Sequence, residues 1–153
     1  MDIEIISYRE EYAHYFSSMN KAWIEQYFVV EALDKMFLDD PEKHIIDRGG
    51  LIFFAKTGDE IAGTMALIKI TDDTFELAKM AVDPKFQGMK IGNRMMTFAI
   101  TKAKEMNLSK LILYSNTSLQ PAIHLYKKFG FKEVAIKSSD FSRANIKMEL
   151  NLK

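Results

Sequence analysis

The sequence of 153 residues contains no cysteine, and its 21 basic and 21 acidic side chains give a formal net charge of zero. Without cysteine the chain can form no disulfide, no thiolate metal site and no covalent intermediate on a cysteine nucleophile. Because the charges cancel, bulk electrostatics gives no reason to expect a nucleic acid or a membrane surface as a partner.

Histidine is also scarce, and the three present, His14, His44 and His124, are far apart in the sequence. None belongs to a pair at the spacing of metal ligands, so we expect no metal site. The N-terminal MDIEIISYRE lacks the basic stretch and apolar core of a signal peptide. No apolar run approaches the roughly 18 residues that span a bilayer. We therefore expect a cytoplasmic protein with no membrane partner.

The composition that remains, 48% apolar and 27% charged, is typical of a globular domain. No linker or internal repeat interrupts the chain, so we expect a single domain over residues 1–153. Its apolar periodicity switches between steps of two and steps of three and four. Strands are expected near 3–5 and at 51–56, 61–70, 74–82, 111–114, 131–136 and 146–150, and helices at 10–27, 31–38, just after Asp40, at 91–106 and at 121–129. Gly130 is expected as the C′ residue that ends the last helix. This order predicts an α+β fold with a mixed sheet flanked by helices.

A strand, a glycine-containing turn and a helix follow one another in AKMAVDPKFQGMKIGNRMM. The first N–H groups of a helix have no intrahelical partner, and the helix dipole favours an anion there. Gly88 and Gly92 permit close approach of the backbone. The fragment is therefore a candidate phosphate site, although glycines that serve only tight packing would give the same pattern.

The run VDPKFQGMKIGN resembles motif A of the GNAT acetyltransferase superfamily, whose signature is Q/R-x-x-G-x-G/A. Gln87 fills its first position and Gly92 its last, while Lys90 replaces the middle glycine. The later run SNTSLQPAIHLYKKFGF resembles motif B of the same superfamily, with Asn116 before a helix that carries A-x-x-L-Y-x-x-x-G-F. The resemblance covers roughly residues 3–150.

The resemblance implies a mostly antiparallel sheet of six to seven strands that splays between its fourth and fifth strands. Acetyl-CoA is expected in the gap, because pantetheine carries two amides that can pair with an open strand edge. Its arm would pair with the backbone of Met80, Ala81 and Val82. Its pyrophosphate would bind the N–H groups of Gln87, Gly88, Met89, Lys90, Ile91, Gly92 and Asn93.

The resemblance also implies catalytic roles on the fourth strand and in motif B. Acyl transfer to an amine needs a base, a donor to the oxyanion and an acid for the leaving thiolate. Glu76 is the expected base, with a surface salt bridge as the alternative, and it would share a strand face with Ala78 and Met80 if no bulge intervenes. The N–H of Met80 or of its neighbour is expected to hold the oxyanion.

Tyr126 matches the family tyrosine that hydrogen-bonds the sulfur of coenzyme A and can protonate it, and a core tyrosine is its alternative. Asn116 is similar to the family asparagine that contacts the cofactor arm, and a capping residue is its alternative. Trp23, Tyr27 and Glu31 lie where acceptor pockets form in the family, although the aromatic stripe is also typical of core packing.

These features predict direct transfer of an acetyl group from acetyl-CoA to a primary amine in a ternary complex, with a small molecule as the acceptor. The alternatives are a protein or peptide Nα-acetyltransferase and a non-catalytic sensor that binds acetyl-CoA. A homodimer is left open. At Lys90 we expect ordinary helical dihedrals, so that the ammonium can reach a phosphate of the cofactor.

Overall fold

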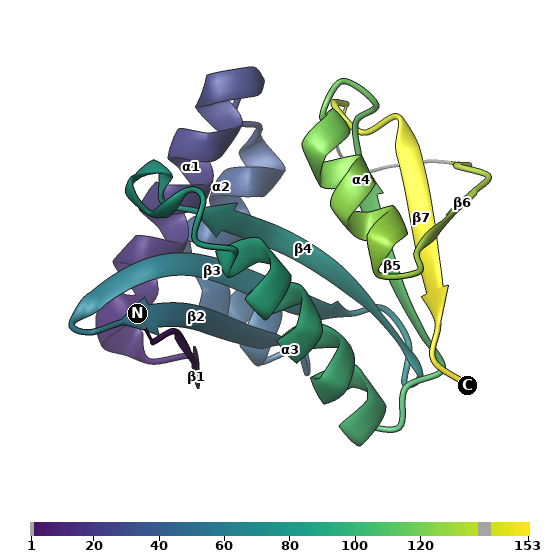
Figure 1. Cartoon of the computed structure of the whole chain (residues 1–153), viewed down its shortest axis with the longest axis horizontal. Helices are drawn as coiled ribbons and strands as arrows, with labels where there is room; N and C mark the ends of the chain where they lie inside the picture. The colour runs from purple at the N-terminus through teal and green to yellow at the C-terminus, as the bar shows by residue number, and fades with distance from the viewer. Residues whose placement is uncertain (1, 138–141) are drawn as a thin grey trace.

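A seven-stranded sheet forms the centre of the molecule in a computed structural model that describes residues 2–137 and 142–153 (Figure 1). Its strands are β1 (Glu4–Ser7), β2 (Leu51–Thr57), β3 (Glu60–Lys69), β4 (Thr74–Val82), β5 (Lys110–Ser115), β6 (Lys132–Val134) and β7 (Ile146–Asn151). They are ordered β1-β2-β3-β4-β5-β7-β6, and every neighbouring pair is antiparallel except β4 and β5, which are parallel. The expected mixed, mostly antiparallel sheet is confirmed.

The sheet opens between β4 and β5. These strands pair only at Thr74↔Lys110, Phe75↔Leu111 and Glu76↔Ile112, whereas β4 continues to pair with β3 as far as Gly63↔Val82. Beyond Glu76 the two strands diverge, and Figure 1 shows β4 leading away from β5 and α4. The expected splay is therefore confirmed, and it leaves one edge of β4 without a strand beside it.

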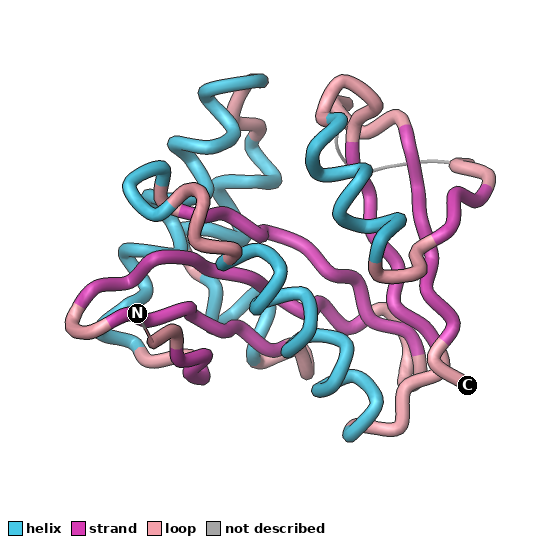
Figure 2. Tube along the Cα trace, viewed as in Figure 1, coloured by secondary structure: helices cyan, strands magenta, loops and turns pink. Residues whose placement is uncertain are grey.

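Helices cover both faces of the sheet (Figures 1 and 2). The helices α1 (Ala13–Tyr27) and α2 (Ala32–Asp39) lie on one face, α3 (Ile91–Glu105) crosses the other, and α4 (Gln120–Lys128) lies beside β5 and β7. The short turns of helix are η1 (Glu10–Tyr12), η2 (Glu42–Ile46) and η3 (Pro84–Phe86). Among the described residues, no helix combines the length and the apolar character that crossing a membrane requires.

Two apolar clusters fill the spaces between the sheet and these helices. Phe53 belongs to the cluster on the α3 side with Met95 and Met96, and the adjacent Phe54 belongs to the cluster on the α1 side with Phe16. Consecutive side chains of a strand point to opposite faces, so β2 contributes to both clusters. Each fully buried side chain of this size contributes about 1.5–3 kcal/mol. The clusters fix the sheet from both sides and so define where the edge of β4 lies.

One expected strand is shorter than the sequence pattern indicated. The prediction of a strand over 131–136 was wrong in its extent, because only Lys132–Val134 pairs with β7. Phe131 belongs instead to the end of α4, where its N–H donates to the carbonyl of Tyr126 at 3.1 Å. Gly130 has φ +98° and donates to Lys127 at 3.0 Å, which completes the left-handed helix end expected there.

Candidate active site

A β-bulge interrupts β4 where the sheet begins to open. Thr64 of β3 lies opposite Ala81 and Ala66 lies opposite Ala78, so Lys79 and Met80 together face the single residue between them on β3. Lys79 has φ +53°, a left-handed conformation that is unfavourable for a residue with a Cβ. The extra residue reverses the alternation of side chains that follows it. The condition set for Glu76 and Met80 to share a face therefore fails, and Met80 packs with the cluster on the α3 side.

Buried hydrogen bonds hold the backbone of this bulge. The hydroxyl of Thr64 donates to the carbonyl oxygen of Lys79 at 3.4 Å. Nδ2 of Asn20 donates to that hydroxyl at 3.0 Å and to the carbonyl oxygen of Phe16 at 2.8 Å. Asn20 and Thr64 are 2% and 0% exposed, so these bonds compete little with water. These hydrogen bonds thus connect α1, through Thr64 of β3, to the bulge in β4.

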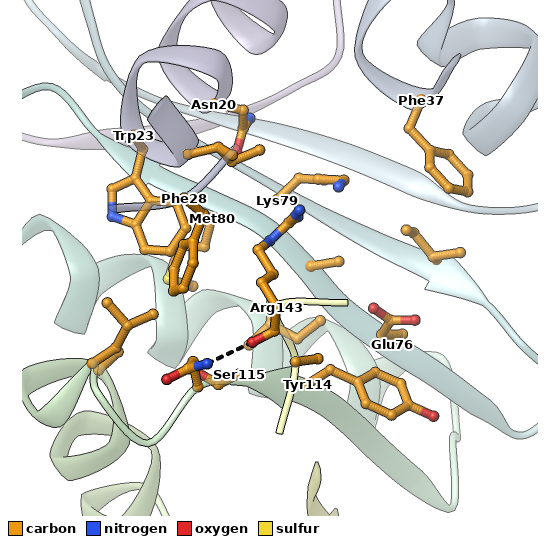
Figure 3. Close-up of a pocket in the computed structure, with 18 of the residues that line it drawn as sticks. Asn20, Trp23, Phe28, Phe37, Glu76, Lys79, Met80, Tyr114, Ser115 and Arg143 are labelled. Carbon is orange, nitrogen blue, oxygen red and sulfur yellow. Dashed lines mark hydrogen bonds between the residues drawn. The ribbon is translucent and has the colours of Figure 1, made fainter. Parts of the chain in front are cut away.

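A pocket of about 300 Å³ lies at the opening between β4 and β5. Its wall includes five of the residues singled out in the sequence: Trp23, Glu76, Met80, Asn116 and Tyr126. In the view of Figure 3, Glu76 and Tyr114 lie at one end, Trp23, Phe28 and Met80 at the other, and Lys79 and Arg143 between them. The fold therefore brings together the expected base, the bulge backbone and the expected acid from β4 and α4.

Tyr126 lines this pocket from α4 and is partly buried. Its ring lies 6.1 Å from that of Phe131, centroid to centroid, and its carbonyl takes part in the left-handed helix end described above. Burial raises the pKa of its hydroxyl to about 12. The hydroxyl is therefore protonated at neutral pH, which is the state that an acid or a hydrogen-bond donor requires.

Asn116 lies directly after β5, and its amide already has two partners. Oδ1 accepts from the N–H of Ser118 at 2.9 Å, and Nδ2 donates to the carbonyl oxygen of Arg143 at 2.6 Å. The first bond is the local turn contact typical of an asparagine at a strand end. The second joins β5 to the segment before β7 and closes one side of the pocket (Figure 3).

The loop before α3 has the form of an anion cradle. Gly88 has φ +85°, and a Cβ built on it would meet no atom within 4 Å, so the space beside it is open. A Cβ on Gly92 would meet only Leu125, at 3.6 Å. The N–H groups that begin α3 at Ile91 face outward from the helix start, as anion sites do. Gln87 lies at the same loop, in the wall of a neighbouring cavity.

The prediction for Lys90 was wrong. The residue precedes α3 with φ +59° and ψ 32°, a left-handed conformation, instead of helical dihedrals. The family glycine is thus replaced where glycine is conformationally favoured, and a lysine there costs roughly 1–2 kcal/mol of strain. The prediction failed because the apolar periodicity of α3 begins directly after Lys90. That periodicity carries no information about the conformation of the residue before the helix.

A buried ion cluster on the α2 side of the pocket was not predicted. Asp34 of α2 is 0% exposed and accepts from Nζ of Lys79 at 2.8 Å and from both Nη atoms of Arg143 at 2.8 and 2.7 Å. Burial by itself raises the pKa of Asp34, but these bonds and the N–H of Glu31 outweigh it and lower that pKa to about 2. Burial lowers the pKa of Lys79, and Asp34 opposes that effect. Within the part of the chain that the structure describes, the cluster joins Lys79 and Arg143 to the carboxylates of Asp34 and Glu31.

A lysine within the apolar run FELAKMAV was the one signal that could have indicated this cluster, because a lysine in a buried strand needs an acidic partner. Nothing in the sequence identified Asp34 or Arg143 as the partners. Glu31, expected at the acceptor pocket, caps α2 and accepts from Nη1 of Arg143 at 3.1 Å.

Trp23 separates the main pocket from a second cavity of about 430 Å³, and its side chain contributes to both walls. Its ring lies 5.5 Å from that of Tyr27 and 6.5 Å from that of Phe28. Tyr27 is 52% exposed and lines the second cavity with Gln87, so it is not part of the core. The aromatic stripe thus has a core side and a cavity side.

A splayed sheet, a bulge in its fourth strand and an anion cradle at the next helix define an acyltransferase fold that accepts a nucleotide-bearing thioester. The family model of the acetyltransferase (GNAT) family matches residues 8–131 of the chain. The chain belongs to that family, which confirms the resemblance found in motifs A and B.

Relatives and solved structures agree with this assignment. An uncharacterized N-acetyltransferase of Bacillus subtilis, YvbK, is 33% identical over 74% of this chain and 75% of its own length. A B. subtilis protein provisionally named as the alanine N-acetyltransferase of ribosomal protein bS18 is 26% identical over 82% of this chain and 75% of its own length. Spermidine N(1)-acetyltransferase of Escherichia coli is 27% identical over 80% of this chain and 68% of its own length.

The fold is shared with many solved acetyltransferases. A GNAT acetyltransferase from Staphylococcus aureus Mu50 superposes with a TM-score of 0.88 at 24% identity and covers 99% of this chain and 100% of its own. The PaiA N-acetyltransferase of Thermoplasma acidophilum, solved in complex with coenzyme A, has a TM-score of 0.76 at 19% identity, covering 99% of each chain.

Proposed function

We propose that the protein transfers the acetyl group of acetyl-CoA to the primary amine of a small molecule, by direct attack in a ternary complex. The observation that carries this proposal is the convergence of Glu76, the bulge backbone and Tyr126 on one pocket at the opening of the sheet. These supply the three functions that acyl transfer to an amine requires. Family membership supports the same chemistry.

The residues present fit acetyl-CoA. The edge of β4 beyond Glu76 has no strand beside it, so the backbone of Met80, Ala81 and Val82 can pair with the amides of pantetheine. The open space at Gly88 and the N–H groups from Gln87 to Asn93 suit a pyrophosphate. When bound, acetyl-CoA supplies an activated acetyl thioester.

Each catalytic step then falls to a side chain or backbone group of this chain. Glu76 accepts the proton of the attacking amine, directly or through a water. The N–H of Met80, displaced from the regular ladder by the bulge, holds the oxyanion that forms on the acetyl carbonyl. The hydroxyl of Tyr126, which is protonated at neutral pH, donates a proton to the departing thiolate.

Two features favour a small amine as the acceptor. The pocket is small, about 300 Å³, and Arg143 and the α2 side close it next to Lys79. Among the relatives, the E. coli enzyme is named for spermidine, which is an amine of suitable size. The provisional name of a B. subtilis relative, for an alanine of ribosomal protein bS18, keeps a protein or peptide acceptor as the alternative outcome.

The test is a thiol-release assay with acetyl-CoA and a panel of polyamines, amino acids, aminoglycosides and short peptides. The proposal predicts turnover with at least one small amine and a slower rate with Glu76→Gln, whose defect shrinks as rising pH deprotonates the amine unaided. Turnover restricted to peptides would establish the alternative acceptor. Binding of acetyl-CoA without turnover of any amine would indicate a sensor.

A further inference from the structure

The buried carboxylate of Asp34 contacts two side chains of the pocket wall without lining the pocket itself. Lys79, one partner, belongs to the β4 bulge, and Arg143, the other, belongs to the segment between β6 and β7. Both partners line the pocket, whereas Asp34 is fully buried behind them. Asp34 is thus placed to set the positions of Lys79 and Arg143 without itself facing the pocket.

We propose that Asp34 is a positioning residue of the acetyl-transfer site, which fixes the β4 bulge and the Arg143 wall relative to each other across the opening of the sheet. The inference rests on the proposed function, since it assigns the bulge to the oxyanion. Asp34 touches no reacting atom. It acts through Lys79 and Arg143.

The geometry leaves these two contacts little freedom. Oδ1 and Oδ2 of Asp34 each accept from a different Nη of Arg143, and a paired contact of this kind fixes orientation as well as distance. Oδ1 also accepts from Lys79, and Oδ2 also accepts from the N–H of Glu31 at 2.9 Å. Every contact is therefore anchored to the first turn of α2. A helix end with a reciprocal cap is a rigid base for such a group.

The bulge needs such support. Lys79 is held with φ +53°, and its carbonyl oxygen accepts from the hydroxyl of Thr64. The side chain of Lys79, 6% exposed, fixes the same residue from the α2 side. A strained conformation persists where its surroundings over-determine it. The direction of the next N–H, that of Met80, depends on this conformation.

The two arms of the sheet also need a second connection. Among the residues that the structure describes, strand pairing between the two arms is limited to Thr74–Glu76 of β4, at the closed end. Arg143 joins the C-terminal arm at the open end, because its carbonyl oxygen accepts from Asn116 and its guanidinium reaches α2. Misplacing reacting groups by about 1 Å can cost 10²-fold in rate.

The decisive experiment uses Asp34→Asn, which keeps the side-chain shape and an oxygen for the cap but removes the charge. Lys79 and Arg143 then repel each other more strongly, because the carboxylate that contacts both of them is gone. The double variant Asp34→Asn/Lys79→Met removes one of these cations and leaves Arg143 balanced by Glu31. Asp39→Asn, an exposed position at the end of the same helix, is the matched control.

For each variant we would measure the melting temperature, the Kd for acetyl-CoA, and kcat and KM for an amine that the wild type acetylates. We expect kcat to fall 10- to 100-fold in Asp34→Asn and in the double variant, even though the double variant regains melting temperature. The Kd for acetyl-CoA should change less than kcat, because the N–H groups expected to hold the pyrophosphate lie in the loop at Gly88, outside the bulge. Asp39→Asn should match the wild type.

Recovery of both kcat and melting temperature in the double variant would overturn the proposal, because Asp34 would then only balance charge. If Asp34→Asn does not fold, the double variant alone decides. A wild type that acetylates no amine disproves the proposed function, and amide hydrogen exchange at Met80 then decides the present inference. Exchange at least tenfold faster in the double variant supports it, and unchanged exchange contradicts it.

Discussion

Two lysines in left-handed conformation lie on either side of the segment that joins β4 to α3, Lys79 within β4 and Lys90 just before α3. They differ in how that conformation is maintained. Lys79, in the bulge, is held through its side chain by Asp34 and through its carbonyl oxygen by Thr64. Lys90, before α3, is exposed, and the hydrogen bond described for it is its backbone carbonyl accepting from Arg94 at 3.1 Å. The conformation of Lys79 is thus supported by bonds from its side chain and its carbonyl oxygen, whereas the bond described for Lys90 involves its backbone alone.

The difference matches the demands of the two ends. In the proposed mechanism, an oxyanion donor at the bulge must keep one direction, and a polar network of buried groups is suited to that. In the same proposal, several N–H groups at the start of α3 share the diffuse charge of the pyrophosphate, so the exact residue before the helix matters less. We therefore expect changes at Lys79 to be large and changes at Lys90 to be small.

The largest expected effect is on stability, from Lys79→Met. The substitution removes a cation that contacts the buried Asp34, and removing one partner of a buried ion network costs about 3 kcal/mol. Urea unfolding measures the change. The matched control is Lys85→Met, which removes a lysine 60% exposed and paired with Glu60, and it should cost less than about 1 kcal/mol. Equal costs at the two sites would show that the bulge lysine is no better supported than a surface one.

The free energy of unfolding should depend on acid pH through the same network. The pKa of Asp34 is about 2 in the folded protein against 3.8 for the free side chain, so the unfolded chain takes up its proton first as the pH falls. The stabilisation is fully present above about pH 4 and is lost between about pH 4 and pH 2, and it amounts to about 2 kcal/mol. Unfolding free energies measured across this range should fall more steeply for the wild type than for Asp34→Asn/Lys79→Met. Lys90→Met should leave the slope unchanged.

Much of this architecture follows from local patterns in the sequence. The order of strands and helices, the splay and the left-handed end of α4 at Gly130 were predicted because each depends on short-range periodicity or on a recognisable motif. The bulge at Lys79 was not, because an extra residue in a strand shows only against its partner strand. The contact of Lys79 with Asp34 spans 45 positions, and that with Arg143 is set by how α2 meets the segment before β7.

A smaller effect on stability and on affinity for acetyl-CoA is expected from Gly88→Ala, in the loop before α3. Gly88 has φ +85°, where a Cβ costs roughly 1–2 kcal/mol, although no atom lies close enough to clash. The melting temperature should fall slightly, and the affinity for acetyl-CoA should fall with it if the loop relaxes away from the anion. Isothermal titration measures the second effect. Gly58→Ala, at a turn between β2 and β3 with φ +59° and similarly open space, is the control that should lose stability but keep its affinity.

The smallest and most discriminating effects concern Lys90, where backbone strain and side-chain charge oppose each other. Lys90→Gly removes both, and Lys90→Ala removes the charge but keeps the Cβ that makes φ +59° unfavourable. Without cofactor, Lys90→Gly should therefore be more stable than Lys90→Ala by about 1 kcal/mol in urea unfolding.

Affinity for acetyl-CoA should show the contribution of the charge of Lys90. If the ammonium of Lys90 attracts a phosphate across the surface, both variants should bind acetyl-CoA more weakly by about 0.3–1 kcal/mol, and the loss should shrink in high salt because exposed charges are screened. Tighter binding by Lys90→Gly than by the parent protein would instead mean that the lysine obstructs the cradle. In that case the two left-handed lysines differ in kind, since one supports its end of the site and the other impairs it.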